Sequence, residues 1–269
     1  YLQTADINGE QLSLSIESAD ILNPINSLSR TAYIAKKVSE IESFDFDYIN
    51  VSTIQLGTEV NKIKFPSDVL SLKKDKPLSI IIKDSEIVNA EPLAYKDHKY
   101  RPKVLFPIFF NSIMPEIRSH VGSPQKFYYG GLGIVLNSEI QFNRNLFLTS
   151  KLGHSIYDNF DEKASQPASN LPHVRTEIVD YLNGAETYLS KLQLDYIWSP
   201  KRNMFAKLSG GIFEQMYGGY GAEFIYKPFH RNIAVGYEFY RVKRREYDQK
   251  FNFFDYKVQT DHINFAYYH

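Results

Sequence analysis

The stretch that decides the fold class is Glu-Thr-Tyr-Leu-Ser-Lys-Leu-Gln-Leu-Asp-Tyr-Ile-Trp, residues 186–198. Every second position from Tyr188 to Trp198 is mostly apolar, while Lys191 and Asp195 lie between them. A β-strand turns successive side chains to opposite faces, so this stretch predicts a strand with one apolar and one largely polar face. Ten residue steps of about 3.3 Å, tilted by roughly 40°, span about 25 Å. That height matches the apolar band of an outer-membrane β-barrel, with Tyr188 and Trp198 as its aromatic girdle.

Similar alternation recurs after residue 104, separated by turn signals. The other segments are 132–142, 146–156, 204–217, 220–227, 233–244 and 256–268. We count eight or nine strands with alternately short and longer connections, whereas residues 158–171 predict a long polar loop. The sequence therefore predicts a mainly β protein, with an antiparallel up-and-down transmembrane β-barrel over residues 104–269. We expect this barrel to be an incomplete segment.

Residues 1–98 follow a different pattern. Asn23 and Pro24 form a helix start, and apolar residues recur at helical spacing up to Ile41. Strand-like alternation flanks this helix at 11–17, 48–60 and 78–82. We interpret residues 1–98 as a small α/β periplasmic domain, and the proline-bracketed stretch 91–102 as the linker. The start at Tyr1 and the end at His269 suggest a processed chain or a fragment.

Composition narrows the classes of protein. The 269 residues carry 31 basic and 31 acidic side chains, so no global basic field exists to attract nucleic acid. The chain has no cysteine, which excludes disulfides and thiolate-metal sites. The mean hydropathy is −0.35, and no run of 18 apolar residues predicts a transmembrane helix. Aromatic residues make up 15%, which suits both barrel girdles and sugar-stacking surfaces.

Periodicity leaves a second architecture open. An alternating strand also fits a soluble β-sandwich or lipocalin-like barrel whose apolar face points inward. Strands in soluble proteins usually run about 5–6 residues, and the segments in this chain run about 10–14. Strand length therefore favours the membrane barrel.

Several strings in the second half occur together and in a fixed order. They are Leu171-Pro-His-Val-Arg175, the glycine-rich stretch 211–228, Arg244-Arg-Glu-Tyr-Asp-Gln-Lys-Phe251, Asp255-Tyr256 and Thr260-Asp-His262. This set resembles the YjbH-type family of outer-membrane lipoproteins, which includes the GfcD-like proteins of capsule operons. The resemblance is dense over 104–269 and weak over 1–100. Asp261 stands where the family pattern has Gly.

The resemblance implies more than this chain contains. Members are usually much longer, with a lipid-anchored N-terminus and barrel strands on both sides of such a segment. They are associated with exopolysaccharide or capsule production and are thought to assist glycan secretion across the outer membrane.

Polar residues of these segments are the candidates for lumen or glycan contact. A charge facing lipid at mid-depth costs roughly 2–4 kcal/mol, so charged side chains are expected to turn inward. The candidates are Arg175, Glu214, Glu223, Glu238, Arg244, Asp255 and His262. They either form structural ion pairs across the lumen or line a glycan path.

No catalytic, cofactor or metal site is expected. The glycines at 218–221 lack the GK[ST] sequence of a phosphate loop, and no HExxH or GxSxG pattern occurs. Glu214 and Glu223 are a conceivable glycosidase pair. The basic run 243–245 is interpreted as a rim cluster that binds lipid phosphates or surface polysaccharide.

The sequence thus predicts an outer-membrane protein that assists export or assembly of a surface polysaccharide as a non-catalytic conduit or scaffold. The expected partners are the surface polysaccharide, outer-membrane lipids and a periplasmic accessory protein that docks on residues 1–98, but no nucleic acid. Two alternatives stay open at this point. One is a soluble β-rich glycan-binding module, and the other is a glycan-modifying enzyme.

Overall fold

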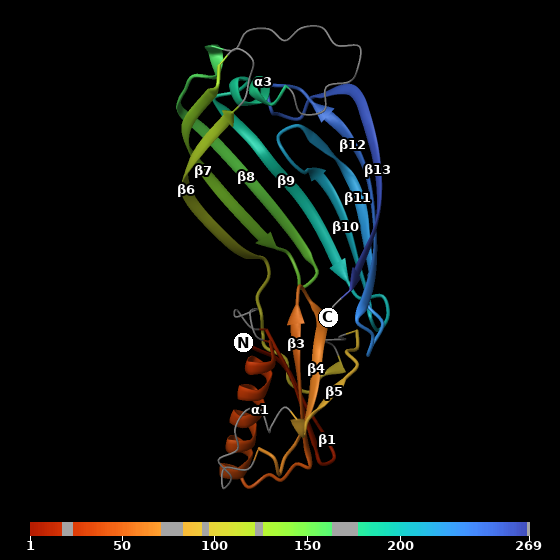
Figure 1. Ribbon diagram of the computed structural model, residues 1–269. Coiled ribbons are helices and arrows are strands. Elements are labelled where there is room, and N and C mark those ends of the chain that lie inside the picture. The colour runs from red at the N-terminus through yellow and green to blue at the C-terminus, as the bar shows by residue number, and fades with distance from the viewer. Residues whose placement is uncertain (18–23, 71–82, 93–96, 122–125, 163–176, 268–269) are drawn as a thin grey trace.

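The computed structural model describes two β-sheets that meet end to end (Figure 1). A five-stranded sheet with one long helix forms one end, and a larger curved sheet forms the other. The mainly β prediction is confirmed. The described residues are 1–17, 24–70, 83–92, 97–121, 126–162 and 177–267.

The smaller sheet is built around a crossover helix. Its strands, in spatial order, are β1 (Leu2–Asn8), β2 (Gln11–Ile16), β3 (Tyr48–Gln55), β4 (Thr58–Pro66) and β5 (Glu86–Val88). Strands β2 and β3 are parallel, so a crossover must join them, and α1 (Pro24–Ile41) provides it. Helix α1 buries Leu28 and Ala32 against Ile49 and Phe65. No described helix is both long and apolar enough to cross a membrane.

The helix begins where the sequence predicted it. The predicted cap residue Asn23 and the predicted strand 78–82 lie outside the described residues. The division of the chain into domains at residues 98 and 104 stays a prediction.

The two sheets are tied to each other by loops. The Asp6 carboxylate accepts a hydrogen bond from the Lys99 backbone N–H at 2.6 Å, which holds the connecting segment against β1. Arg144, in the turn before β8, donates to the side chain of Gln3 at 2.7 Å. Gly57 has φ +74°, and a side chain there would collide with the Arg144 carbonyl. A glycine is therefore needed where the turns meet.

The larger sheet has eight antiparallel strands, each paired with its neighbours in sequence. They are β6 (Ile108–Val121), β7 (Tyr128–Gln141), β8 (Leu146–Asp158), β9 (Thr187–Trp198), β10 (Met204–Ile212), β11 (Tyr217–Tyr226), β12 (Ile233–Arg245) and β13 (Phe253–Tyr267). The up-and-down order is thus as predicted. Within the described part of the chain β6 and β13 are open edges, so the sheet is curved but not a closed barrel.

The end of this sheet far from the smaller one is covered by short helices (Figure 1). They are the 3₁₀ turn η2 (Phe160–Glu162) and α3 (Ile178–Asn183). The sequence predicted only a loop near here, because six residues are too few to show a helical period.

The faces of the sheet follow from the ladder pairs. The outer face exposes large apolar side chains such as Ile113 at 73%, Ile117 at 73% and Phe265 at 80%. In β9 the register shifts at Ser190, which has no partner in β8. This bulge turns Tyr188 to the inner face, beside Lys191. Tyr188 is only 1% exposed.

The prediction that Tyr188 and Trp198 share an apolar face is therefore wrong for Tyr188. An extra residue reverses the alternation that the sequence pattern assumed to be continuous. Trp198 lies on the outer face and stacks on Tyr196 at a ring-centroid distance of 5.2 Å.

Candidate functional site

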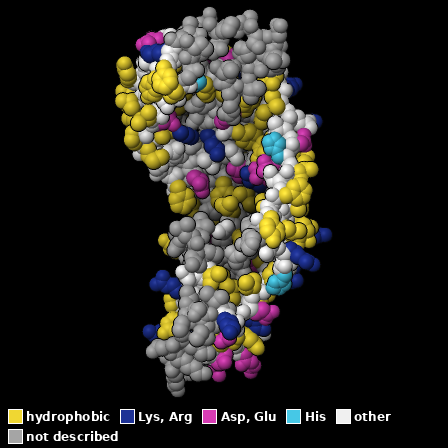
Figure 2. Space-filling view, in the orientation of Figure 1, with side chains coloured by type: hydrophobic (Ala, Val, Ile, Leu, Met, Phe, Trp, Pro, Cys, Tyr) yellow, Lys and Arg dark blue, Asp and Glu magenta, His cyan; other side chains and the backbone are white. Residues whose placement is uncertain are grey.

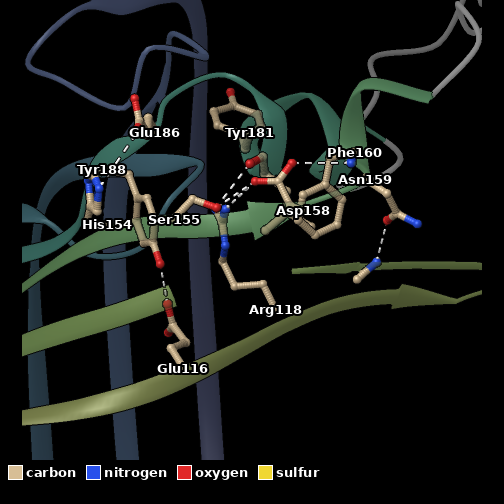
Figure 3. A network of polar contacts seen from close by, with 12 residues as sticks. Glu116, Arg118, His154, Ser155, Asp158, Asn159, Phe160, Tyr181, Glu186 and Tyr188 are labelled. Atoms are coloured by element: carbon tan, nitrogen blue, oxygen red, sulfur yellow. Dashed lines mark hydrogen bonds and ion pairs between the residues drawn. The ribbon is translucent and has the colours of Figure 1, made fainter. Parts of the chain in front are cut away.

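A four-residue arrangement occupies the inner face of β6, β8 and β9. The Glu116 carboxylate forms an ion pair with Lys151 at 2.5 Å. It also accepts a hydrogen bond from the Tyr188 hydroxyl (Figure 3). The Tyr188 ring lies on Gly153, its partner across the ladder, where any side chain would enter the ring. Gly153 therefore makes room for the tyrosine that orients Glu116.

Arg118 connects this arrangement to the covering helices. Its side chain is 3% exposed, and its guanidinium lies 4.5 Å from the Tyr188 ring centroid. It pairs with Asp158 at 3.3 Å and donates to the Leu182 carbonyl at 3.1 Å (Figure 3). Ser155 donates to the same carboxylate at 2.6 Å. A buried charge with these partners holds α3 against the sheet.

The same arrangement recurs on β10, β11 and β12. The Glu223 carboxylate pairs with Lys207 at 2.6 Å and accepts a hydrogen bond from the Tyr240 hydroxyl. The Tyr240 ring covers Gly221, again its cross-strand partner. Two sets of Gly, Tyr, Glu and Lys thus link three strands each on the inner face.

A row of polar residues continues from the second set to the sheet edge. Glu223 is opposite Glu238, and Glu238 is opposite His262 on β13. The Glu238 carboxylate accepts from Asn264 at 2.8 Å. Charged side chains gather over the middle of the larger sheet, with hydrophobic side chains along both flanks (Figure 2). The structure brings the candidates Glu223, Glu238 and His262 together, but their contact with glycan stays a prediction.

The next candidate, Arg244, lies in a buried cap at the end of the sheet. It pairs with Glu177 and donates to the hydroxyls of Tyr247 at 2.8 Å and Tyr181 at 3.2 Å. Burial raises the pKa of the Tyr181 phenol. Burial and the hydrogen bond to Glu177 raise the pKa of Tyr247 to about 12. Both phenols therefore stay protonated at neutral pH.

Arg245 is the centre of this cap and has no exposed surface. Its guanidinium donates to backbone carbonyls of strand β9 and of two separate loops. The acceptors are Leu189 at 2.9 Å, Glu214 at 3.1 Å, Gln215 at 3.2 Å, Gln249 at 2.5 Å and Lys250 at 2.9 Å. The strings 211–217 and 244–251, singled out in the sequence, meet at this side chain and have a structural role there.

The conceivable glycosidase pair is not brought together. Glu214 lies in the turn before β11, where its N–H donates to the Tyr217 carbonyl at 3.2 Å. Glu223 is six residues beyond Tyr217 along β11, which is about 20 Å. Paired glycosidase carboxylates lie only about 5–10 Å apart.

Asp255 does not join the inner row. It is exposed and lies two residues from Lys257 on β13, so alternation places it on the outer face. Its assignment to the lumen is therefore wrong, because its side-chain parity is opposite to that of His262. Arg175 lies outside the described residues. The described part of the chain contains no metal-binding group of three His, Asp or Glu side chains.

Sequence reasoning missed Glu116 and Arg118 because the inner face of β6 also carries the apolar residues Phe110 and Met114. The mixed pattern hides their parity. The best sequence signal for Glu116 and Arg118 is a glycine on one strand that pairs with a tyrosine on the next, as Gly153 does with Tyr188.

The Gly153 contact predicts a specific loss of stability. The change Gly153→Ala forces the Tyr188 ring away from Glu116 and is expected to cost about 1–3 kcal/mol of unfolding free energy. The measurement is denaturant unfolding in detergent, followed by the fluorescence of Trp198, the one tryptophan of the chain. The control is Gly210→Ala, since a Cβ there lies 3.9 Å from the nearest atom, the Gly219 carbonyl oxygen. Equal midpoints for the two variants would contradict the arrangement.

The cap predicts a larger loss at Arg245. The change Arg245→Met leaves buried carbonyls without donors and is expected to cost about 3–5 kcal/mol. Thermal unfolding and protease cleavage of the loop 246–252 should both report it. The matched change Arg231→Met removes an exposed charge and should shift the midpoint little. An Arg245 variant as stable as the Arg231 variant would show that the cap is not held by this side chain.

Comparison with known proteins agrees with the motif pattern. Residues 2–269 match the family described as "Exopolysaccharide biosynthesis protein YbjH". The "Uncharacterized lipoprotein YjbH" of Escherichia coli (strain K12) is 32% identical over 157 residues, which cover 56% of this chain and 22% of that protein. The chain thus spans about a fifth of the relative's length, and no solved structure matches it. The resemblance predicted from the sequence is confirmed, and this chain belongs to the YjbH family of exopolysaccharide biosynthesis proteins.

Proposed function

We propose that the protein is an outer-membrane β-barrel component that assists export or assembly of an exopolysaccharide or capsule. It acts as a conduit or scaffold without covalent catalysis. The observation that carries this proposal is the opposite character of the two faces of the larger sheet. Side chains such as Ile117 and Phe265 are largely exposed on one face, and paired charges lie on the other. Lipid would cover the apolar face, because soluble monomers rarely expose so large an apolar surface.

The inner face has the chemistry of a polysaccharide path. Lys151, Lys207 and Glu223 keep 38%, 26% and 27% of their side-chain surface exposed, so they remain within reach of a ligand. Such groups exchange hydrogen bonds with sugar hydroxyls, and tyrosine rings stack on sugar faces. Since the carboxylates are already paired with lysines, an acidic or a neutral glycan can pass without stranding a buried charge.

The relative's name supports an envelope location. It is a lipoprotein, and we infer that this protein lies in the bacterial outer membrane with its smaller sheet in the periplasm. In the periplasm, the smaller sheet and helix α1 would offer a docking surface for a periplasmic accessory protein. Further strands, from the same polypeptide or from another, would pair with the open edges β6 and β13 and complete the barrel.

The deciding experiment is fractionation of the native, full-length protein. Outer and inner membranes are separated and washed in carbonate. Retention in the outer-membrane pellet, with release by detergent only, supports the barrel. Recovery as a monodisperse species in buffer alone favours a soluble β-rich glycan-binding module and overturns the proposal. Turnover of a glycan by the purified protein, lost on Glu223→Gln, would favour a glycan-modifying enzyme.

Adjacent residues of β9 allow the two faces to be tested separately. Lys191 lies on the inner face and Leu192 on the outer face. The change Lys191→Trp narrows the path and is expected to lower exported polysaccharide several-fold at unchanged protein level. The change Leu192→Trp is the matched control, because a tryptophan suits a lipid-facing surface. The reverse result, with only Leu192→Trp harmful, would indicate a soluble protein whose apolar face is its core.

A further inference from the structure

The outer face of β12 and β13 changes character along its length. Ile233, Tyr237 and Phe239 on β12 are followed on the same face by Arg241 and Lys243. Arg241 is eight residues from Ile233, which is about 20 Å of height for a strand tilted by roughly 40°. The cations therefore begin near the level at which a membrane's apolar band of about 25 Å would end.

A groove of about 600 Å³ lies among these cations. Tyr220 and Phe253 are among its lining residues. Gly218 leaves it open, since a side chain there would meet the Phe253 ring at 3.0 Å. Lys243 and Lys257 belong to the same lining.

The two lysines of the groove form no ion pair with the residues that the structure describes. Lys243 and Lys257 are directly opposite each other across the ladder, and neither forms an ion pair within that part of the chain. Arg241 donates to the neutral side chain of Gln259 at 3.1 Å. Like charges in opposite positions destabilise a sheet. An anion bound between the two lysines would relieve their electrostatic repulsion.

Nearby carboxylates do not pair with the two lysines. Asp261, opposite Phe239 at the edge of the apolar band, attracts Arg241 electrostatically, and its carboxylate accepts from Tyr237 at 2.6 Å and from Gln259 at 3.0 Å. Asp255 lies on the other side of Lys257 and is exposed. Asp255 and Asp261 lie on either side of the groove along β13, so they mark the two limits of the cationic site on this strand.

We propose that this groove binds a phosphate group of a membrane lipid headgroup. The phosphate lies between Arg241, Lys243 and Lys257, and the acyl chains run along Phe239 and its apolar neighbours. This inference rests on the proposed membrane location. It uses the face opposite to the one assigned to the glycan.

Continuity with the apolar band favours a lipid over an acidic polysaccharide. A lipid brings a phosphate and an apolar tail in the same spatial order as the cations and the apolar residues. Of the basic run 243–245, only Lys243 takes part, since Arg244 pairs with Glu177 in the cap and Arg245 is buried there. The structure therefore replaces the predicted three-residue cluster by one formed across two strands.

The test measures lipid binding to the full-length protein purified in a neutral detergent. The probe is phosphatidylglycerol, counted by native mass spectrometry, with phosphatidylcholine as the lipid that carries no net charge. The double change Lys243→Gln and Lys257→Gln is expected to weaken phosphatidylglycerol binding about 30-fold, at about 1 kcal/mol for each lysine. The control double change, Lys37→Gln and Lys83→Gln, removes the same charge from exposed sites on the smaller sheet's unit.

Each outcome separates the explanations. Loss in the groove variant but not in the control supports the site. Equal binding of the two lipids, or equal loss in both variants, overturns it. Displacement by millimolar inorganic phosphate would indicate a free-phosphate site, and displacement by the exported polysaccharide a glycan site.

The proposed membrane location is checked on the same samples. Carbonate-resistant retention of both variants in the outer membrane shows that the barrel is intact, so that a failure of lipid binding counts against the groove alone. Release of the unmodified protein by carbonate would instead count against the proposed function.

Discussion

The alternation of side-chain direction along the strands determines which residues lie on each face of the larger sheet. Each strand places one row of side chains on each face, and the ladder keeps the rows of eight strands in register. Apolar and charged residues can then occupy the two opposite faces of a single β-sheet. A single extra residue, Ser190, is enough to move Tyr188 from one surface to the other. The alternation thus sets the faces, and the bulge determines which side chains meet the charges.

The inner face is stabilised by side-chain contacts between strands, and those of Glu116 on β6 reach past β7 to β8 and β9. Tyr188 and Tyr240 each lie across a glycine and reach a carboxylate that a lysine also holds. A glycine at these positions lets the sheet bend toward the ring that covers it. The cap around Arg245 fixes the loops at one end in a comparable way, by supplying donors to loop carbonyls that lie outside the strands. The tyrosine–glycine contacts and the Arg245 cap both stabilise the shape of the sheet. Both leave the lysines of the inner face accessible.

The open edges connect this architecture to the proposed function. Strands β6 and β13 have 14 and 15 residues, and in lipid their unpaired backbone groups would each cost several kcal/mol. A membrane location therefore requires further strands on both edges. The length of the Escherichia coli relative is in keeping with this requirement, since the match covers only 22% of it. On this view the paired charges of β10–β13 belong to one wall of a larger lumen.

The sequence by itself determined the strands, their up-and-down order, the helix that begins at Pro24 and the family, because each depends on local spacing or on motifs in a fixed order. It also placed Glu223, Glu238 and His262 on one face, since no bulge interrupts their strands near these positions. Only the tertiary structure decided that Tyr188 points inward, that Arg245 is buried and Arg244 joins its cap, and that Glu116 meets Lys151. It also placed Lys243 opposite Lys257. These outcomes depend on register shifts and on loops that meet across long sequence separations, and side-chain periodicity carries no information about either.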